Sequence, residues 1–267
     1  MAGCGSEKKI MINKGSIKFI HSLRLKKQRD IHQKFVVEGD KLVKEFLSSD
    51  WHISELFGLP EWLTKLSSEI IEKPGQVHEV TDLELKKIST LITPNQALAI
   101  VEKPDYTLNL EELKREISLL LCDIQDPGNL GTILRIAAWF GIHNIVCSHS
   151  TVDLFNSKVV QATMGAILHV NVHYVNAKEF LSDFSKTGLP IYGTDHRGKN
   201  IYEANLETKG IIIMGNESQG IPTDFDQYVN PWISIPGYGS HSKKIESLNV
   251  AVATAIVCAE FRRREIS

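Results

Sequence analysis

The sequence predicts an α/β protein made of two domains. Along its 267 residues, short apolar runs typical of strands alternate with segments whose apolar positions recur at helical spacing. Between two such series, KPDYTLNLEE (103–112) combines a proline with polar residues, so we place a domain boundary there. Beyond the boundary the strands are almost continuously apolar, as in GIIIMGN (210–216). We therefore predict domains at residues 1–105 and 106–267, the second built on a mostly parallel sheet covered on both faces.

The first domain is predicted to be a small α/β layer. Its predicted helices occupy residues 17–33, 40–50 and 60–71. Asp40 suits the capping of the second helix, and Pro60 lies in the first turn of the third. The predicted strands are KFVVEG (34–39), HISELFGL (52–59) and ALAIVEK (97–103).

The second domain repeats the alternation more strongly. Its predicted strands are SLLLCDI (118–124), HNIVCS (143–148), HVNVHYV (169–175), LPIYGTD (189–195), GIIIMGN (210–216) and PWISIPG (231–237). The helical patterns between and after them are ILRIAAWF (133–140), SKVVQATMGAI (157–167), AKEFLSDFSK (177–186) and LNVAVATAIVCAEFRRR (248–264). In sheets of this kind, ligands bind in loops beyond the carboxyl ends of the strands. Functional residues are therefore expected in those loops.

Charge is unevenly distributed, although the formal net charge is only −2. From Lys8 to Lys34 the single acid is Asp30, and the chain ends in three arginines at 262–264. Such a run most often forms a solvated helix face. It is alternatively a footprint for a phosphate backbone, and composition leaves both open. The nine basic residues of the first run are Lys8, Lys9, Lys14, Lys18, Arg24, Lys26, Lys27, Arg29 and Lys34.

Composition argues against a membrane protein, a secreted protein and a metal-binding protein. No apolar run approaches the roughly 20 residues of a membrane helix, and the N-terminus lacks the apolar core of a signal peptide. We therefore expect a cytoplasmic protein. The four cysteines are widely spaced, without a C-x-x-C pair, so neither a metal site nor a disulfide framework is indicated. Cys122 and Cys147 are expected to be buried core thiols.

The loop QDPGNLGT, after the strand SLLLCDI, opens a helix that contains Arg135. Gly128 and Gly131 lack the spacing G-x-G-x-x-G, and no G-K-[ST] follows, so the two common nucleotide-binding loops are absent from the sequence. Asn129 suits helix capping, which is the default role of an asparagine in this place. Arg135 lies among apolar residues and must either reach the surface or find a buried partner.

Two later loops also carry polar groups. In GNESQGIP, glycines flank Asn216 and Glu217 at the carboxyl end of a strand, and an ordinary turn is the simplest explanation for this loop alone. In IPGYGSHSKKIESLNVAVATAI, a glycine-rich loop leads to Ser247 at the start of a helix of small residues. Ser247 suits an N-cap, although a helix N-terminus is also a polar site for a ligand.

Together, the three loops resemble a known series of motifs. N-x-G-x-x-x-R (129–135), G-N-E-x-x-G (215–220), and I-P-G (235–237) followed by S-L-N-V-A-V-A (247–253) resemble the ordered motifs of the SpoU, or TrmH-like, RNA ribose methyltransferases of the SPOUT class. The match covers about the last 150 residues of the 267. K-F-V-V-E-G-D-K-L-V-K-E (34–45) also resembles the substrate-binding domain, similar to RNA-binding ribosomal proteins, that often precedes this catalytic domain.

The resemblance implies transfer of a methyl group from S-adenosylmethionine to a ribose 2′-hydroxyl of RNA. It implies a homodimeric SPOUT domain with a trefoil knot, preceded by a small ribosomal-protein-like α/β domain that binds RNA. Carried over to this chain, the catalytic positions are Arg135, Asn129, Glu217, Ser247 and Asn249. The cofactor-binding positions are Gly215, Ile235 and Leu248. Arg135 would either activate the hydroxyl as a base or stay protonated and grip a neighbouring phosphate.

The chain departs from the family between Ile235 and Leu248. This loop is about four residues longer than usual, with SHSK (240–243) inserted, and glycine follows Pro236 where methionine is common. The loop lines the cofactor pocket in relatives, and Ile235 lies at its start. Lys243 and Lys244 are expected to be solvated rather than bound to RNA.

Three alternatives accompany the expected function. Ribosomal RNA is favoured over transfer RNA, because the ribosomal-protein-like first domain suits recognition of RNA loops and bulges. A non-catalytic RNA-binding protein would have no need of all five polar positions. An enzyme of the same class acting on a base nitrogen is disfavoured by the S-L-N motif and the arginine.

Overall fold

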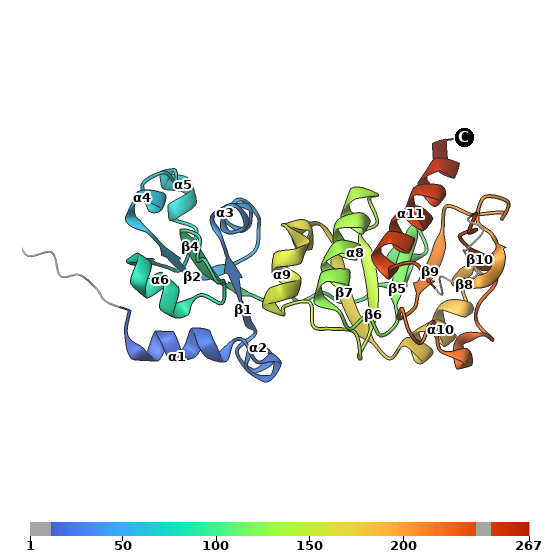
Figure 1. Cartoon of the computed structure of the whole chain (residues 1–267), viewed down its shortest axis with the longest axis horizontal. Helices are drawn as coiled ribbons and strands as arrows, with labels where there is room; N and C mark the ends of the chain where they lie inside the picture. The colour runs from blue at the N-terminus through green and yellow to red at the C-terminus, as the bar shows by residue number, and fades with distance from the viewer. Residues whose placement is uncertain (1–11, 239–246, 267) are drawn as a thin grey trace, which may run out of the picture. The chain divides into compact units, whose positions relative to one another are not determined.

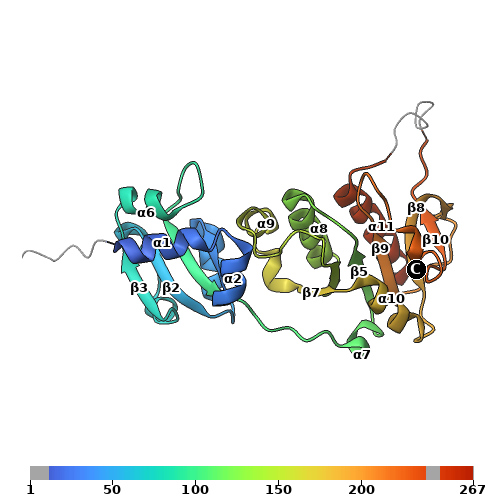
Figure 2. The same cartoon turned by 90° about the horizontal axis from the view of Figure 1, so that it is seen from below.

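The chain forms two compact units (Figures 1 and 2). The structure is a computed structural model and describes residues 12–238 and 247–266. The N-terminal unit comprises residues 12–104 with 155–157, and the C-terminal unit comprises the other described residues. Each unit is built on one sheet. Within the described ranges, no helix has the length and apolar character needed to cross a membrane.

The N-terminal unit contains a four-stranded mixed sheet in the order β1-β4-β2-β3. The strand β4 is antiparallel to β1 and β2, whereas β2 and β3 are parallel. The strands are β1 (Lys34–Glu38), β2 (Ile53–Gly58), β3 (Gln76–Glu79) and β4 (Ala97–Glu102). The helices are α1 (Lys14–Ser22), α2 (Lys26–His32), α3 (Asp40–Ser48), α4 (Pro60–Leu63), α5 (Ser68–Ile71) and α6 (Asp82–Ile88). The predicted α/β class is confirmed.

The single helix predicted over residues 17–33 is wrong, because two helices, α1 and α2, occupy this segment. Arg29 accounts for the break. Its side chain is buried, and Nη1 donates hydrogen bonds to the carbonyl oxygens of Leu23 at 2.9 Å and Arg24 at 2.8 Å. The end of α1 leaves such carbonyls without helical partners. A side chain read from the sequence as part of a basic run therefore stabilises the turn between two helices.

The C-terminal unit contains six parallel strands in the order β10-β8-β9-β5-β6-β7, which confirms the predicted parallel sheet. The strands are β5 (Ile117–Leu121), β6 (Asn144–Ser148), β7 (Asn171–Val175), β8 (Ile191–Asn200), β9 (Gly210–Met214) and β10 (Trp232–Ser234). The helices are α7 (Leu110–Leu113), α8 (Pro127–Trp139), α9 (Ser157–Thr163), α10 (Ala177–Ser185) and α11 (Val250–Ile266), with short 3-10 turns at Ala166–His169 and Thr223–Phe225.

The central strands of this sheet position the loops identified in the sequence. Leu121, at the end of β5, lies opposite Met214, at the end of β9. Because parallel strands end at the same edge, the loop that leads into α8 and the loop after β9 emerge side by side. The helices α8 and α11 also pack against each other. All three motifs of the sequence are thus carried to one edge of the C-terminal unit.

Candidate active site

Three polar side chains, one from each loop, meet at the carboxyl edge of the C-terminal sheet. Asn129, in the first turn of α8, donates a hydrogen bond from Nδ2 to Oε1 of Glu217. Its Oδ1 accepts a hydrogen bond from Nδ2 of Asn249 at 2.9 Å. One amide therefore links the loop after β9 to the start of α11. We call Asn129, Glu217 and Asn249 the polar triad.

The helices that frame the polar triad have other caps than the sequence suggests. Asp126 caps α8, since its Oδ1 accepts the N–H of Asn129 at 2.8 Å. Asn249 caps α11, where its Oδ1 accepts the N–H of Ala251 at 3.0 Å. Capping, the alternative role of Asn129 and Ser247, therefore falls to Asp126 and Asn249. The proline at the first position of α8 starts that helix upstream of Asn129, which leaves the Asn129 side chain available to the triad.

Asn216 fixes the shape of the loop after β9. Its Oδ1 accepts the N–H groups of Ser218 at 2.9 Å and Gln219 at 3.1 Å, and its Nδ2 donates to the carbonyl oxygen of Asp123 at 2.9 Å. At Gly215, a Cβ atom would lie 2.4 Å from the backbone of Gly220, so a side chain does not fit there. The turn is therefore tight and tied to the end of β5, which holds Glu217 beside Asn129.

Asp123, which the sequence analysis did not single out, supports this arrangement. Its φ of +59° is in the left-handed region, which is unusual for a residue other than glycine. The Ser148 hydroxyl donates to Oδ1 of Asp123 at 2.7 Å and accepts its N–H at 2.9 Å, and the Ser150 hydroxyl also donates to Oδ1. This conformation aims the Asp123 carbonyl at Asn216. An aspartate directly after an apolar strand was the available signal.

Arg135 reaches the surface instead of finding a buried partner. It lies on an exposed position of α8. Across the ranges 12–238 and 247–266, the structure gives its guanidinium neither a hydrogen bond nor an ion pair, with the polar triad or with any other group. Trp139, one helical turn further along α8, is 85% exposed. The helix α8 therefore presents a cation and a large aromatic ring to the exterior.

Comparison with known proteins identifies the family. The SpoU rRNA Methylase family model matches residues 116–259, a segment that contains the entire polar triad. The chain belongs to the SpoU rRNA methylase family. The model of the MRM3-like substrate binding domain matches residues 14–99 of this SpoU-family chain.

Relatives of known structure share both units. A TrmH-family protein from Porphyromonas gingivalis superposes with a TM-score of 0.86 at 38% identity, over 95% of this chain and 99% of that one. An rRNA methyltransferase from Sinorhizobium meliloti with bound AdoMet superposes with a TM-score of 0.83 at 28% identity, over 96% and 97% of the two chains. The 23S rRNA (guanosine(2553)-2′-O)-methyltransferase RlmP of Bacillus subtilis is 30% identical over 90% of this chain and 93% of its own length.

For the remaining SpoU motif positions, the described residues include no side-chain hydrogen bond to the triad. Ser247 and Leu248 directly precede Asn249 and are exposed, Leu248 by 46%. Ile235, half-buried, follows β10. The inserted SHSK and the expected solvated lysines Lys243 and Lys244 lie in 239–246, outside the described residues.

Two other kinds of site were considered for this SpoU-family chain, a metal site and a cysteine nucleophile. Among the residues that the structure describes, no three His, Cys, Asp or Glu side chains gather as metal ligands. Cys122 and Cys147 are buried, as predicted. Burial, followed by the charge of Asp123, raises the pKa of the Cys122 thiol to about 12. Burial likewise raises the pKa of Cys147. Neither thiol suits a nucleophile at neutral pH.

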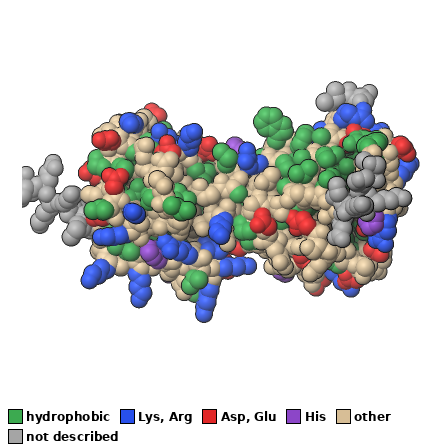
Figure 3. All heavy atoms as spheres, in the orientation of Figure 1, with side chains coloured by type: hydrophobic (Ala, Val, Ile, Leu, Met, Phe, Trp, Pro, Cys, Tyr) green, Lys and Arg blue, Asp and Glu red, His purple; other side chains and the backbone are tan. Residues whose placement is uncertain are grey.

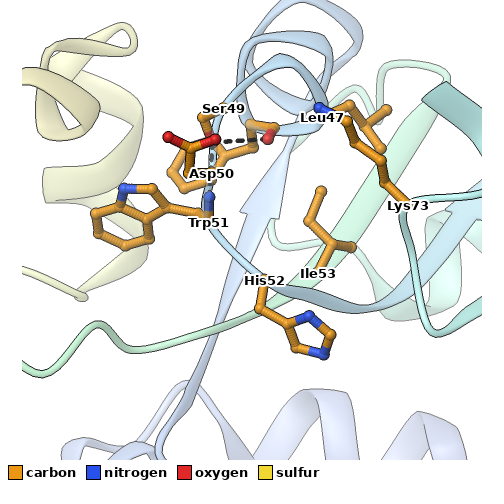
Figure 4. A pocket seen from close by; sticks show the side chains of 8 residues that line it. Leu47, Ser49, Asp50, Trp51, His52, Ile53 and Lys73 are labelled. Carbon is orange, nitrogen blue, oxygen red and sulfur yellow. Dashed lines mark hydrogen bonds between the residues drawn. The ribbon is translucent and has the colours of Figure 1, made fainter. Parts of the chain in front are cut away.

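A pocket of about 270 Å³ lies in the N-terminal unit, between the end of α3 and β2 (Figure 4). The Ser49 hydroxyl in its wall donates to the carbonyl oxygen of Phe46 at 2.8 Å and accepts the N–H of Trp51 at 3.2 Å, so it serves the local turn. Asp50 and Lys73 are the charged lining residues. The pocket contains no counterpart of the polar triad, and we assign the chemistry to the C-terminal unit.

Proposed function

We propose that the chain transfers a methyl group from S-adenosylmethionine to a ribose 2′-hydroxyl of ribosomal RNA. The observation that carries this proposal is the polar triad, in which Asn129 joins Glu217 and Asn249 across the three SpoU motifs. The 2′-O-methyltransferase named among the relatives supports it, as does the relative with bound AdoMet.

The residues around the triad fit the cofactor. S-adenosylmethionine, when bound, supplies an activated methyl group on a positively charged sulfur. The carboxylate of half-buried Glu217 and the amides of Asn129 and Asn249 form a donor and acceptor set suited to a polar, cationic ligand. Gly215 leaves backbone without a side chain at the same loop, and Ile235 and Leu248 would form an apolar wall for the adenine.

Arg135 is proposed to bind the phosphate next to the target ribose. Its guanidinium is exposed and has no recorded partner in the described ranges, so it is available to a phosphate. A charged guanidinium binds phosphate through paired hydrogen bonds and would hold the 2′-hydroxyl in line with the methyl group. The alternative role of Arg135 as a base requires an environment that removes the charge.

The same proposal extends to the assembly and the domain roles. We infer a homodimer, as the resemblance implies, because α8, α11 and the loop before α11 carry exposed apolar side chains that a partner would cover. These are Trp139 at 85% on α8, Val252 at 51% on α11 and Leu248 at 46% in the loop. We also infer a trefoil knot in the C-terminal unit, as the resemblance implies, and a cytoplasmic location, as the composition indicates. Residues 1–105 would bind RNA, supported by the match to a substrate binding domain, and residues 106–267 would carry out the transfer.

Methyl transfer from S-adenosylmethionine with a labelled methyl group tests the function. Protein-free ribosomal RNA and transfer RNA, transcribed in vitro, are the two substrates, and digestion to nucleosides locates the label. We expect 2′-O-methylnucleosides from ribosomal RNA. Label on a base would support the base-nitrogen alternative, and label mainly in transfer RNA would correct the substrate. Failure to bind S-adenosylmethionine in calorimetry would support a non-catalytic RNA-binding protein and contradict the proposal.

A further inference from the structure

A basic face of the N-terminal unit is formed by α1 and α2. Lys14 and Lys18 lie one turn apart on α1, Lys27 lies on α2, and all three side chains are exposed. Lysine and arginine side chains gather along this side of the unit, as the space-filling view shows below the position of α1 and α2 (Figure 3). We call Lys14, Lys18 and Lys27 the lysine triplet.

The structure separates this triplet from the basic residues that have structural roles. Arg29 is buried in the turn between the helices, Arg24 donates to the carbonyl oxygen of Ser89 at 3.1 Å, and Lys34 pairs with Glu102 at 3.6 Å. The arginines at the end of the chain are also committed, since Arg263 and Arg264 both pair with Glu260. For the lysine triplet, by contrast, no ion pair is recorded with any acid of the described chain. Its charge is therefore available to an anionic partner.

The helices that carry the triplet are held in a fixed arrangement. Asn13 caps α1 by accepting the N–H of Ser16 at 2.8 Å, and His21 Nε2 lies 2.6 Å from the carbonyl oxygen of Lys87 at the end of α6. Phe19 of α1 contacts His32 of α2 edge-on, with ring centroids 5.0 Å apart. A platform of this kind binds without first ordering its backbone, which lowers the entropic cost of binding.

Two exposed apolar side chains belong to the same helical segment as the lysines. Leu25, directly before α2, is 63% exposed, and Ile31 near the end of α2 is 60% exposed. Phosphates alone require no apolar contact, whereas unpaired nucleotides present the apolar faces of their bases. The combination of three unpartnered cations with two exposed aliphatic side chains therefore fits single-stranded or bulged RNA better than a regular duplex.

We propose that this face of α1 and α2 docks the substrate RNA, with the lysine triplet on phosphates and Leu25 and Ile31 against an unpaired base. The inference rests on the proposed function, because RNA is favoured over an acidic protein surface by the family of the C-terminal unit. It assigns substrate affinity to the N-terminal unit and the reacting groups to the C-terminal unit.

The test compares two matched double variants of the full chain. Lys18→Gln with Lys27→Gln removes one charge from each helix of the face. Lys65→Gln with Lys73→Gln removes two charges from exposed lysines that follow α4 and α5, which Figure 1 shows on the opposite side of the same unit. The probe is protein-free large-subunit ribosomal RNA, measured for binding over a range of salt concentrations and for methyl transfer at increasing RNA concentration.

We expect the first variant to bind the RNA about tenfold more weakly at low salt, with a salt dependence shallower by about two released counterions. KM for RNA should rise, while kcat at saturating RNA and the affinity for S-adenosylmethionine stay unchanged. The control variant should match the unaltered protein. Equal RNA affinity and salt slope in all three proteins would overturn the docking face, even where the unaltered protein methylates RNA. Absence of methylation by the unaltered protein would instead refute the proposed function.

Discussion

At the scale of single residues, Arg135 is the side chain on which the proposed chemistry depends most. Removing it should lower kcat by about a hundredfold or more, because the substrate hydroxyl loses its alignment with the methyl group. The affinity for S-adenosylmethionine should persist, since no hydrogen bond or ion pair joins Arg135 to the polar triad. Single-turnover methyl transfer and calorimetry on Arg135→Ala measure the two quantities.

Arg135→Lys is the matched control for Arg135→Ala. It keeps the charge but loses the paired hydrogen bonds of a guanidinium, so we expect activity between the unaltered protein and Arg135→Ala. Turnover of a folded Arg135→Ala variant near the unaltered rate would show that the residue has no catalytic role.

Single residues also show which roles a sequence pattern can predict and which it cannot. The motif spacing led to Asn129, Glu217 and Asn249, and the structure brings these three together. Capping, the alternative role of Asn129 and Ser247, falls to neighbouring residues, because Asp126 caps α8 and Asn249 caps α11. Capping depends on where a helix begins within one residue, and several polar residues in succession suit the same role. Asp123 was missed because its place after an apolar strand marks it only as a candidate, whereas its role follows from a left-handed φ that the sequence does not report.

At the scale of elements, the basic runs illustrate why charge patterns are ambiguous. Lys27 and Arg29 are two residues apart in one helix, yet Lys27 faces water and Arg29 is buried against backbone carbonyls. The helical break that Arg29 stabilises could not be predicted, because it depends on a side chain folding back across a turn. By contrast, the apolar runs 118–124 and 210–216 predicted two buried parallel strands, which the structure places at 117–121 and 210–214, since burial on both faces dictates their composition.

The end of α11 should be sensitive to acid. Glu260 is buried, and its hydrogen bonds with Arg263, followed by Arg264, lower its pKa to about 2. A carboxyl group with a lowered pKa in the folded state contributes stability above its unfolded pKa and loses it as the pH falls towards the folded pKa. Glu260→Gln should therefore lower the free energy of unfolding of the C-terminal unit at pH 7 by roughly 1–2 kcal/mol, and its melting temperature should fall as a result. The difference from the unaltered protein should shrink between about pH 4.5 and 2.

Glu265→Gln is the control for this effect at the end of the same helix. Glu265 pairs with Arg262 at 2.6 Å. Without Glu265, Arg262 retains hydrogen bonds to the carbonyl oxygens of Phe140 at 2.6 Å and Gly141 at 2.9 Å, so the loss of stability at pH 7 should be smaller. Thermal unfolding followed by circular dichroism across pH compares the variants. A Glu260→Gln deficit that stays constant down to pH 2 would contradict the role of the carboxylate charge.

At the scale of the whole molecule, we propose that recognition and chemistry are divided between the two units. The C-terminal unit gathers three motifs at one sheet edge, whereas the N-terminal unit offers a fixed basic face without catalytic groups. A flexible RNA that carries both a docking segment and a target ribose would be selected by two surfaces of one protein. Binding at two surfaces raises the affinity for an RNA that fits both over an RNA that fits one. The catalytic residues then do not have to supply this selectivity themselves.

Ribose methylation mapped across the RNA of cells with and without the gene tests the central claim most directly. The account predicts that one 2′-O-methyl group in ribosomal RNA disappears when the gene is absent and returns when the unaltered gene is restored, but not when Arg135→Ala is supplied. Unchanged ribose methylation in both ribosomal and transfer RNA would contradict it.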